Sequence, residues 1–161
     1  MLLPIRNLIL LSCLFIFGCK VNKGKENPKA PILKLLISVS EGPCAGKCPR
    51  LEADFYSGQK MVYRGIARMP VIGSFSYFIP EQLSAGLLSE ARKLKLAELP
   101  DSIPSPEGEQ RIRLKYQLAD GTFKSISAGS KTGPAPFLQF FKTLHREILE
   151  MVSDQEGEKI P

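Results

Sequence analysis

The sequence predicts a single α+β domain, an antiparallel sheet of about six strands in the order ββββ-α-ββ-α with two helices on one face. Short segments that alternate apolar and polar residues are separated by tight turns, a pattern typical of β-hairpins. Two longer segments carry apolar residues at helical spacing on one side only. Because each helix must bury its apolar stripe, we expect both helices to cover one face of the sheet.

The first half of the domain is predicted to form four strands. Residues 32–40 are rich in branched apolar side chains and are followed by Gly42-Pro43, which favours a turn. Residues 51–56 alternate apolar and polar positions, and residues 60–65 return as their hairpin partner. Residues 72–79 form the fourth expected strand.

A helix, a second hairpin and a final helix are predicted to follow. The first helix is expected to open at Pro80, since proline is favoured in the first helical turn. Residues 111–118 and 122–128 alternate on either side of an Asp120-Gly121 turn and predict the hairpin. The last helix is expected after Gly133-Pro134. Candidate core residues are the apolar stripes of the two helices, namely Leu83, Leu87, Leu88, Ala91 and Leu94 in the first and Phe137, Phe140, Phe141, Leu144, Ile148, Met151 and Val152 in the second.

The N-terminal region is typical of an exported chain. Arg6 precedes an apolar run at 8–17, which is shorter than the roughly twenty residues that a membrane-spanning helix needs. The run ends at Ile16-Phe17-Gly18-Cys19, which resembles the lipobox of bacterial lipoproteins. This resemblance implies a signal peptide over 1–18 and acylation of Cys19. An uncleaved signal anchor and a free thiol at Cys19 are the alternatives.

These features predict the organisation of the chain and its compartment. Residues 19–31 form a polar, basic tether, 32–152 the domain, and 153–161 a charged, frayed tail. The N-terminal lipid would anchor the protein in the bacterial cell envelope. Lys20 stands where an aspartate would signal inner-membrane retention, so the outer membrane is favoured. The net charge of +6 is partly carried by the leader and the tether, and export also argues against a nucleic-acid partner.

Two cysteines remain within the domain, Cys44 and Cys48. In an oxidising envelope, so close a pair predicts a disulfide. A thiol-disulfide redox site is the alternative, but such sites have two intervening residues and a helix after the first cysteine. Here three residues intervene and a strand is expected next. His145 is the sole histidine of the sequence, so a metal site is not expected. The sequence has no Walker loop or dinucleotide fingerprint, and no cofactor is expected.

The segment Pro43-Cys44-Ala45-Gly46-Lys47-Cys48-Pro49 also resembles the P-C-x-G-x-C-P signature of a bacterial domain family of unknown function. The hairpin 51–65, with its Tyr63-x-Gly65 ending, supports this resemblance, which covers about residues 33–150. It implies an envelope protein, in many members a lipoprotein, with one helix after the fourth strand and another at the end. It implies no activity.

The candidate binding residues are basic. Arg111, Arg113 and Lys115 share the polar face of one predicted strand, and Lys124 lies on its hairpin partner. These four cations could bind an anionic glycan, a phosphate or an acidic protein, or they could be a solvated face that keeps the domain soluble.

Three other sets of residues are candidate sites with weaker support. His145 is expected at the edge of the apolar stripe of the last helix, with no motif for a catalytic triad. Glu52 and Asp54 share a strand face, where exposed carboxylates are common. Tyr56, Tyr63 and Tyr77 would form a sugar-stacking surface only if they clustered. The sequence therefore indicates a non-enzymatic binding or assembly module on a lipid-anchored envelope protein, with a redox protein using Cys44 and Cys48 as the alternative.

Overall fold

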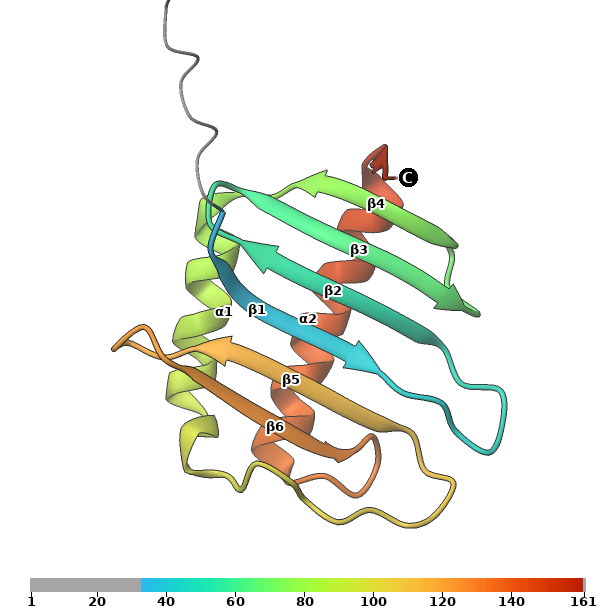
Figure 1. Ribbon diagram of the computed structural model, residues 1–161, viewed down its shortest axis with the longest axis vertical. Helices are drawn as coiled ribbons and strands as arrows, with labels where there is room; N and C mark the ends of the chain where they lie inside the picture. Colours follow the sequence, from blue (N-terminus) through green and yellow to red (C-terminus); the bar gives the residue numbers. More distant parts are fainter. Residues whose placement is uncertain (1–32, 161) are drawn as a thin grey trace, which may run out of the picture. The chain divides into compact units, whose positions relative to one another are not determined.

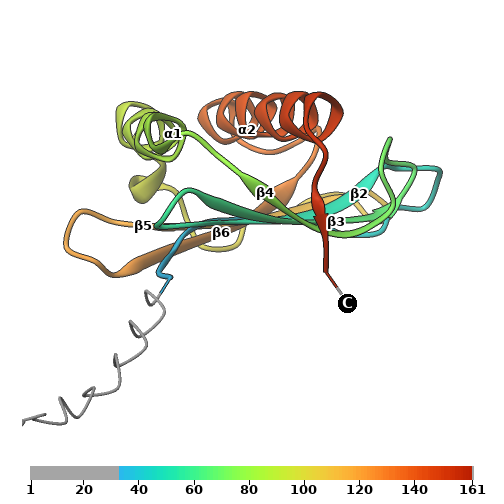
Figure 2. The same cartoon turned by 90° about the horizontal axis from the view of Figure 1, so that it is seen from above.

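The computed structural model describes residues 33–160, and it has the predicted α+β class. One antiparallel sheet forms a layer, and two helices form a second layer on one of its faces (Figures 1 and 2). The expected signal peptide 1–18, the tether 19–31 and the acylation site Cys19 lie outside the described residues.

The helices and strands follow the predicted order, with boundaries within a few residues of those expected. The sheet is formed by β1 (Leu35–Glu41), β2 (Arg50–Tyr56), β3 (Lys60–Ala67), β4 (Gly73–Phe78), β5 (Arg111–Gln117), β6 (Phe123–Gly129) and β7 (Glu158–Lys159). The helices are α1 (Glu81–Lys93), a short 3₁₀ turn (Leu96–Glu98) and α2 (Ala135–Asp154).

The first strand, β1, lies inside the sheet, whose order is β6-β5-β1-β2-β3-β4-β7. The chain adds β2, β3 and β4 to one side of β1 through successive antiparallel pairs. After α1 the chain returns to the other side of β1. There β5 pairs antiparallel with β1, and β6 pairs with β5 as the edge strand. The loops after β1 and before β5 therefore meet at one end of the sheet (Figure 1).

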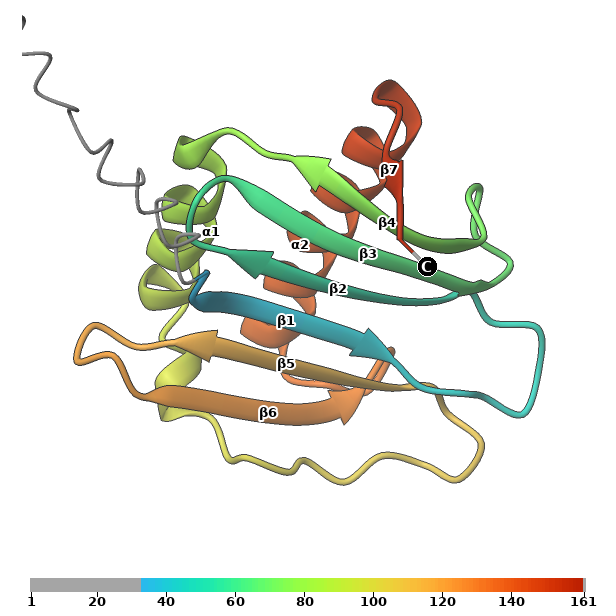
Figure 3. The same ribbon diagram turned by 45° about the horizontal axis from the view of Figure 1, so that its top comes forward.

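The sheet has seven strands where the sequence analysis expected six, because a two-residue strand forms near the C-terminus. Glu158 and Lys159 pair with Ser76 and Phe75 of β4, and the backbone N–H of Ile160 donates to the Ser74 carbonyl at 3.0 Å (Figure 3). This segment was predicted as a frayed tail. It pairs through backbone groups that the edge of β4 leaves open, and so short a strand carries no alternation that could reveal it.

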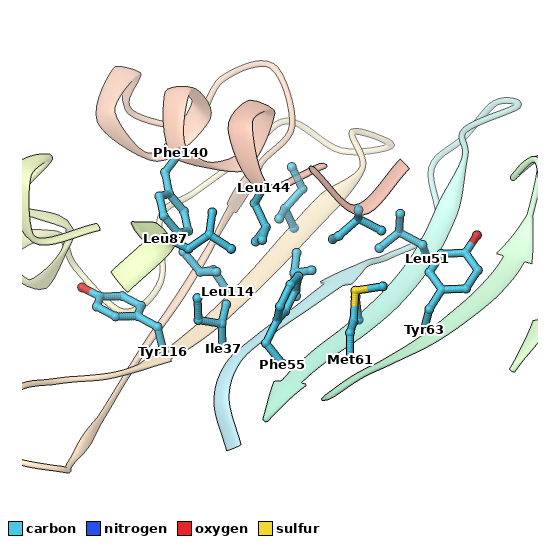
Figure 4. Close-up of a cluster of buried hydrophobic side chains, with 14 of the residues drawn as sticks. Ile37, Leu51, Phe55, Met61, Tyr63, Leu87, Leu114, Tyr116, Phe140 and Leu144 are labelled. Atoms are coloured by element: carbon cyan, nitrogen blue, oxygen red, sulfur yellow. The ribbon is translucent and has the colours of Figure 1, made fainter. Parts of the chain in front are cut away.

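The core lies between the sheet and the two helices. Leu87 of α1 and Phe140 and Leu144 of α2 point toward the inward side chains of the central strands (Figure 4). In the predicted helical stripes, Leu87, Ala91, Phe137, Phe140, Leu144, Ile148, Met151 and Val152 are buried, and Leu83, Leu88, Leu94 and Phe141 pack against them while partly exposed. The stripes were therefore assigned to the correct faces.

The opposite face of the sheet, hereafter the open face, is not covered by either helix (Figure 2). Alternate residues of each strand point to it because successive side chains in a strand face opposite sides. On β1, β2 and β5 these include Ser38 and Ser40, Glu52 and Asp54, and Arg113 and Lys115.

Candidate functional site

The cysteine loop, residues 42–49, connects β1 to β2 at one end of the sheet. The sulfurs of Cys44 and Cys48 lie within bonding distance, with their Cα atoms 6.1 Å apart. Both cysteines are half-buried, and no helix begins at either of them. The two cysteines therefore form a disulfide that closes a short loop between two strands.

Contacts with the segment before β5 hold this loop in place. The N–H of Gly42 donates to the Arg111 carbonyl at 2.8 Å, and the N–H of Ala45 donates to the Gly108 carbonyl at 2.9 Å. The buried side-chain amide of Gln110 donates to the carbonyls of Gly42, at 3.2 Å, and Pro49, at 2.6 Å. Gln110 thus joins the two ends of the cysteine loop. These hydrogen bonds hold the loop in place at the edge of the open face.

The structure brings together three of the four predicted basic residues. Arg111, Arg113 and Lys115 all point to the open face, since the residues between them, Ile112 and Leu114, are buried in the core.

The fourth residue, Lys124, lies on the opposite face, so its assignment to the basic patch was wrong. It pairs in register with buried Tyr116, and its side chain forms an ion pair with Asp101 at 2.5 Å. The physical reason is register: a residue directly opposite another across an antiparallel pair shares its face, and Tyr116 faces the core.

Arg111 and Lys115 are partly engaged within the domain. The Arg111 guanidinium donates to the Ser127 hydroxyl at 3.2 Å and to the Ile103 carbonyl at 3.1 Å, which ties the loop before β5 to β6. The Lys115 ammonium lies 4.7 Å from the centre of the Phe123 ring, a cation–π contact. All these partners are uncharged, so both positive charges remain available to an anion.

A hollow of about 520 Å³ opens on this face beside the cysteine loop. Three arginines line it, and Arg50 at the start of β2 is the one that the sequence analysis missed. The alternation of β2 indicates that Arg50, Glu52 and Asp54 lie on one face of the strand. The local sequence does not show that β2 and β5 both pair with β1, which is what brings Arg50 close to Arg113. The other lining residues are Ser40, Glu41, Gly42, Pro43, Cys44, Glu52, Gly108, Glu109, Arg111 and Arg113.

Two of the three acids that line the hollow, Glu52 and Glu109, have partners outside it. Glu52 pairs with Arg64 of β3 at 3.4 Å. Glu109 accepts hydrogen bonds from the hydroxyl and backbone N–H of Thr132 and from the N–H of Lys131, and these bonds lower its pKa.

Within residues 33–160, none of the three arginines that line the hollow, Arg50, Arg111 and Arg113, forms a salt bridge with an acid. The Nε of Arg50 is buried there without a hydrogen-bond partner. The three arginines at this end of the open face therefore have no directly paired acid within the described residues.

On the helix side, Glu41 of β1 lies beneath His145 of α2. The Oε1 of Glu41 is 3.7 Å from the Nδ1 of His145, and the imidazole also lies against the Phe141 ring, with the ring centres 5.4 Å apart. Burial raises the pKa of Glu41 to about 7, although the N–H of Leu51 opposes this, and burial lowers the pKa of His145. Glu41 therefore titrates close to neutral pH and not in the acidic range that is usual for a carboxyl.

This pair was not predicted, because Glu41 marks the end of a strand in the sequence and gives no sign of pointing inward. Glu41 is 3% exposed, and its Oε2 and the His145 Nε2 are buried without hydrogen-bond partners in the described part of the chain. His145 lies at the margin of the α2 stripe, as expected.

The three tyrosines do not form the surface that would stack on a sugar. Tyr63 and Tyr77 are core residues, with ring centres 6.2 Å apart, and the Tyr63 hydroxyl donates to the Val71 carbonyl at 2.9 Å. Their strand positions face the helices, whereas Tyr56 belongs to the other side of β2.

The described residues contain neither a group of metal ligands nor a membrane-spanning helix. No three histidine, cysteine or acidic side chains in the range 33–160 are grouped so that they could hold a metal ion. Over the same range, no helix has the length and apolar character needed to cross a membrane.

Fold and site together define an α+β domain with a clipped loop and an arginine-lined hollow on an uncovered sheet face. Residues 35–148 match a domain of unknown function (DUF6438), and the chain belongs to this family. No curated protein matches the chain. The match confirms the expectation of a domain of unknown function in this region, and the lipoprotein character of the chain stays a prediction.

Proposed function

We propose that the chain is a lipid-anchored protein of the bacterial envelope, acylated at Cys19, and that its DUF6438 domain is a non-enzymatic module that binds an anionic envelope component. The lipobox-like segment and the polar tether 19–31 support the anchor. Lys20 supports the outer membrane as the location. Two or more acyl chains on Cys19 would suffice for stable attachment.

The observation that carries the binding proposal is the set of cations on the open face. Arg111, Arg113 and Lys115 stand in one row along β5, and none of them forms a salt bridge with an acid of the described chain. A positive patch of this kind attracts anions and orients them before contact. An anionic glycan, a phosphate-bearing component or an acidic protein has the required charge.

The anchor is tested by the intact mass of the protein extracted from membranes, with and without thiol alkylation. A mass that begins at Cys19 with added acyl chains, and no alkylatable thiol, is the expected result. A mass without lipid would contradict the anchor. Ready alkylation of Cys44 and Cys48 would contradict the closed disulfide.

Binding is tested by crosslinking in intact cells. The double variant Arg113→Ser, Lys115→Ser should lose a crosslinked envelope partner that the wild type captures. Lys93→Ser, Lys142→Ser removes the same charge from exposed positions on the two helices and is the matched control. An unchanged crosslink profile in the open-face variant would refute the role of this patch.

A thiol-disulfide redox role for Cys44 and Cys48 is the alternative, favoured by one observation: both half-buried cysteines line a second hollow, together with Lys47 and Glu107. A redox protein would need a reduction potential of about −270 to −120 mV. Equilibration with glutathione and dithiothreitol buffers measures it, and a far more negative value would eliminate this role.

A further inference from the structure

We propose that the hollow beside the cysteine loop binds a phosphoryl group, held by Arg50, Arg111 and Arg113. The inference names the ligand class of the module proposed above and rests on that function. It adds to that function a specific pocket, the participation of Arg50 from β2, and a phosphoryl group as the ligand.

The floor of the hollow is built from small residues. Ser40 of β1 lies directly between Arg113 of β5 and Glu52 of β2 in the sheet register. Gly42 follows two residues later, and a Cβ there would lie 3.1 Å from the Arg111 carbonyl oxygen. Because neither residue has a long side chain, the space above β1 stays open.

The arginines stand on the two strands that flank this floor. β5 and β2 are separated by β1, so they lie about 10 Å apart. Arg111 and Arg113 line the hollow on the β5 side and Arg50 lines it on the β2 side. One oxyanion above Ser40 and Gly42 can therefore be shared by guanidinium groups from both strands.

The geometry also favours preorganisation. Arg111 is held by Ser127 and Ile103 through its Nε and one terminal nitrogen, and no hydrogen bond engages its other terminal nitrogen within the described residues. Gln110 fixes the cysteine loop that forms the adjacent wall. A ligand would meet a site whose walls are already in place, which lowers the entropic cost of binding.

A phosphoryl group fits three guanidinium groups better than a carboxylate does. Its oxygens are arranged tetrahedrally and can accept from donors that approach from different directions, whereas the two oxygens of a carboxylate lie in one plane and suit a single fork. A phosphoryl group can also carry more negative charge than a carboxylate, and so gains more from several guanidinium groups at one place.

The test is isothermal titration calorimetry of the purified full-length protein in a neutral detergent. The probes are inorganic phosphate, glycerol phosphate as a lipid headgroup, and acetate. Saturable binding of phosphate or glycerol phosphate, with acetate much weaker, is expected. Tighter binding of glycerol phosphate would point to a lipid headgroup as the source, and tighter binding of inorganic phosphate to the free ion.

Variants locate the site. Arg50→Gln and Arg113→Gln should each weaken phosphate binding about tenfold or more, as expected for loss of a charge-assisted hydrogen bond. Arg92→Gln, the same change at an exposed position of α1, is the charge control and should leave the affinity unchanged. Far-UV circular dichroism checks that each variant is folded.

A second pair of variants tests the pocket without removing charge. Ser40→Ile fills the floor and should abolish binding, whereas Ser38→Ile, on the same face of the same strand but outside the hollow, should not. Isoleucine suits both positions because β-branched residues are favoured in strands.

Failure of this inference can be distinguished from failure of the proposed function. No phosphate binding by the wild type, or equal affinity in Arg50→Gln, would overturn the phosphoryl site. If the crosslinked partner is still lost in Arg113→Ser, Lys115→Ser, the binding module stands with another anionic ligand. Phosphate binding that survives Ser40→Ile would place the anion on the surface patch and refute the hollow.

Discussion

Replacing Glu41 with glutamine should change the pH dependence of stability, because this carboxyl is buried at the end of β1. Its surroundings contain two titratable groups, His145 at 3.7 Å and the Tyr63 phenol, whose pKa is itself raised to about 12 by burial and by nearby Tyr77 and Glu41. Burial raises the pKa of Glu41 from its ordinary 4.5 to about 7. Glutamine keeps the shape of the side chain and removes its ionisation.

The direction of the effect follows from proton linkage. Between pH 4.5 and 7 the folded state keeps a proton on Glu41 that the unfolded state has released. The free energy of unfolding therefore falls as pH rises through this interval. Each pH unit corresponds to about 1.4 kcal/mol, so ionised Glu41 costs the fold on the order of 3 kcal/mol above pH 7. His145 has a lowered pKa and acts in the opposite direction, its contribution being complete above its ordinary pKa of 6.5.

Urea denaturation followed by far-UV circular dichroism between pH 5 and 8 measures the difference between the two proteins. Glu41→Gln should be the more stable protein at pH 8, by up to about 3 kcal/mol, and the difference should fall below about 1 kcal/mol at pH 5. Glu107→Gln, at an exposed loop position, is the control and should follow the wild type. Parallel pH profiles for Glu41→Gln and the wild type would refute the reasoning.

Three further changes test how the domain is held together. Gln110→Ala removes both hydrogen bonds that join the ends of the cysteine loop and should cost about 1–3 kcal/mol in urea denaturation; an unchanged midpoint would contradict this role. Cys44→Ser with Cys48→Ser should lower the unfolding free energy by about 2 kcal/mol, seen as a lower melting temperature, and equal melting temperatures would show that the clip does not stabilise the fold. Gly65→Ala places a Cβ against the Val71 carbonyl oxygen and within 2.7 Å of the Tyr63 hydroxyl, and should cost about 1–3 kcal/mol, whereas Gly46→Ala meets nothing within 4 Å and should be nearly neutral.

Local patterns in the sequence were enough to predict most of the elements. The alternation in 51–56 and 60–65 specifies a hairpin with one buried face, and β2 and β3 pair in that way. The apolar spacing of the last helix identifies the side of α2 that packs on the sheet, as Phe140 and Leu144 show. Both signals arise from the geometry of one segment, so they can be read without knowing the rest of the fold.

The candidate site was only partly predictable, because it combines strands that are distant in sequence. Arg111 and Arg113 were found from the alternation of β5 alone. Arg50 joins them because β1 lies between β2 and β5, an order that local patterns do not contain. Lys124 was misplaced for the related reason that its face depends on the register of β6 against β5.

The sequence by itself determined the fold class, the order of the elements, the core faces of the helices and the close cysteine pair, because each depends on side-chain periodicity or spacing over a few residues. Only the tertiary structure decided the order of the strands, the seventh strand at the edge of β4, the burial of Glu41 against His145 and the meeting of three arginines around Ser40 and Gly42. These features depend on which distant backbones pair. The pairing is selected by the burial of the whole core and the closure of long loops, and these are properties of the complete chain.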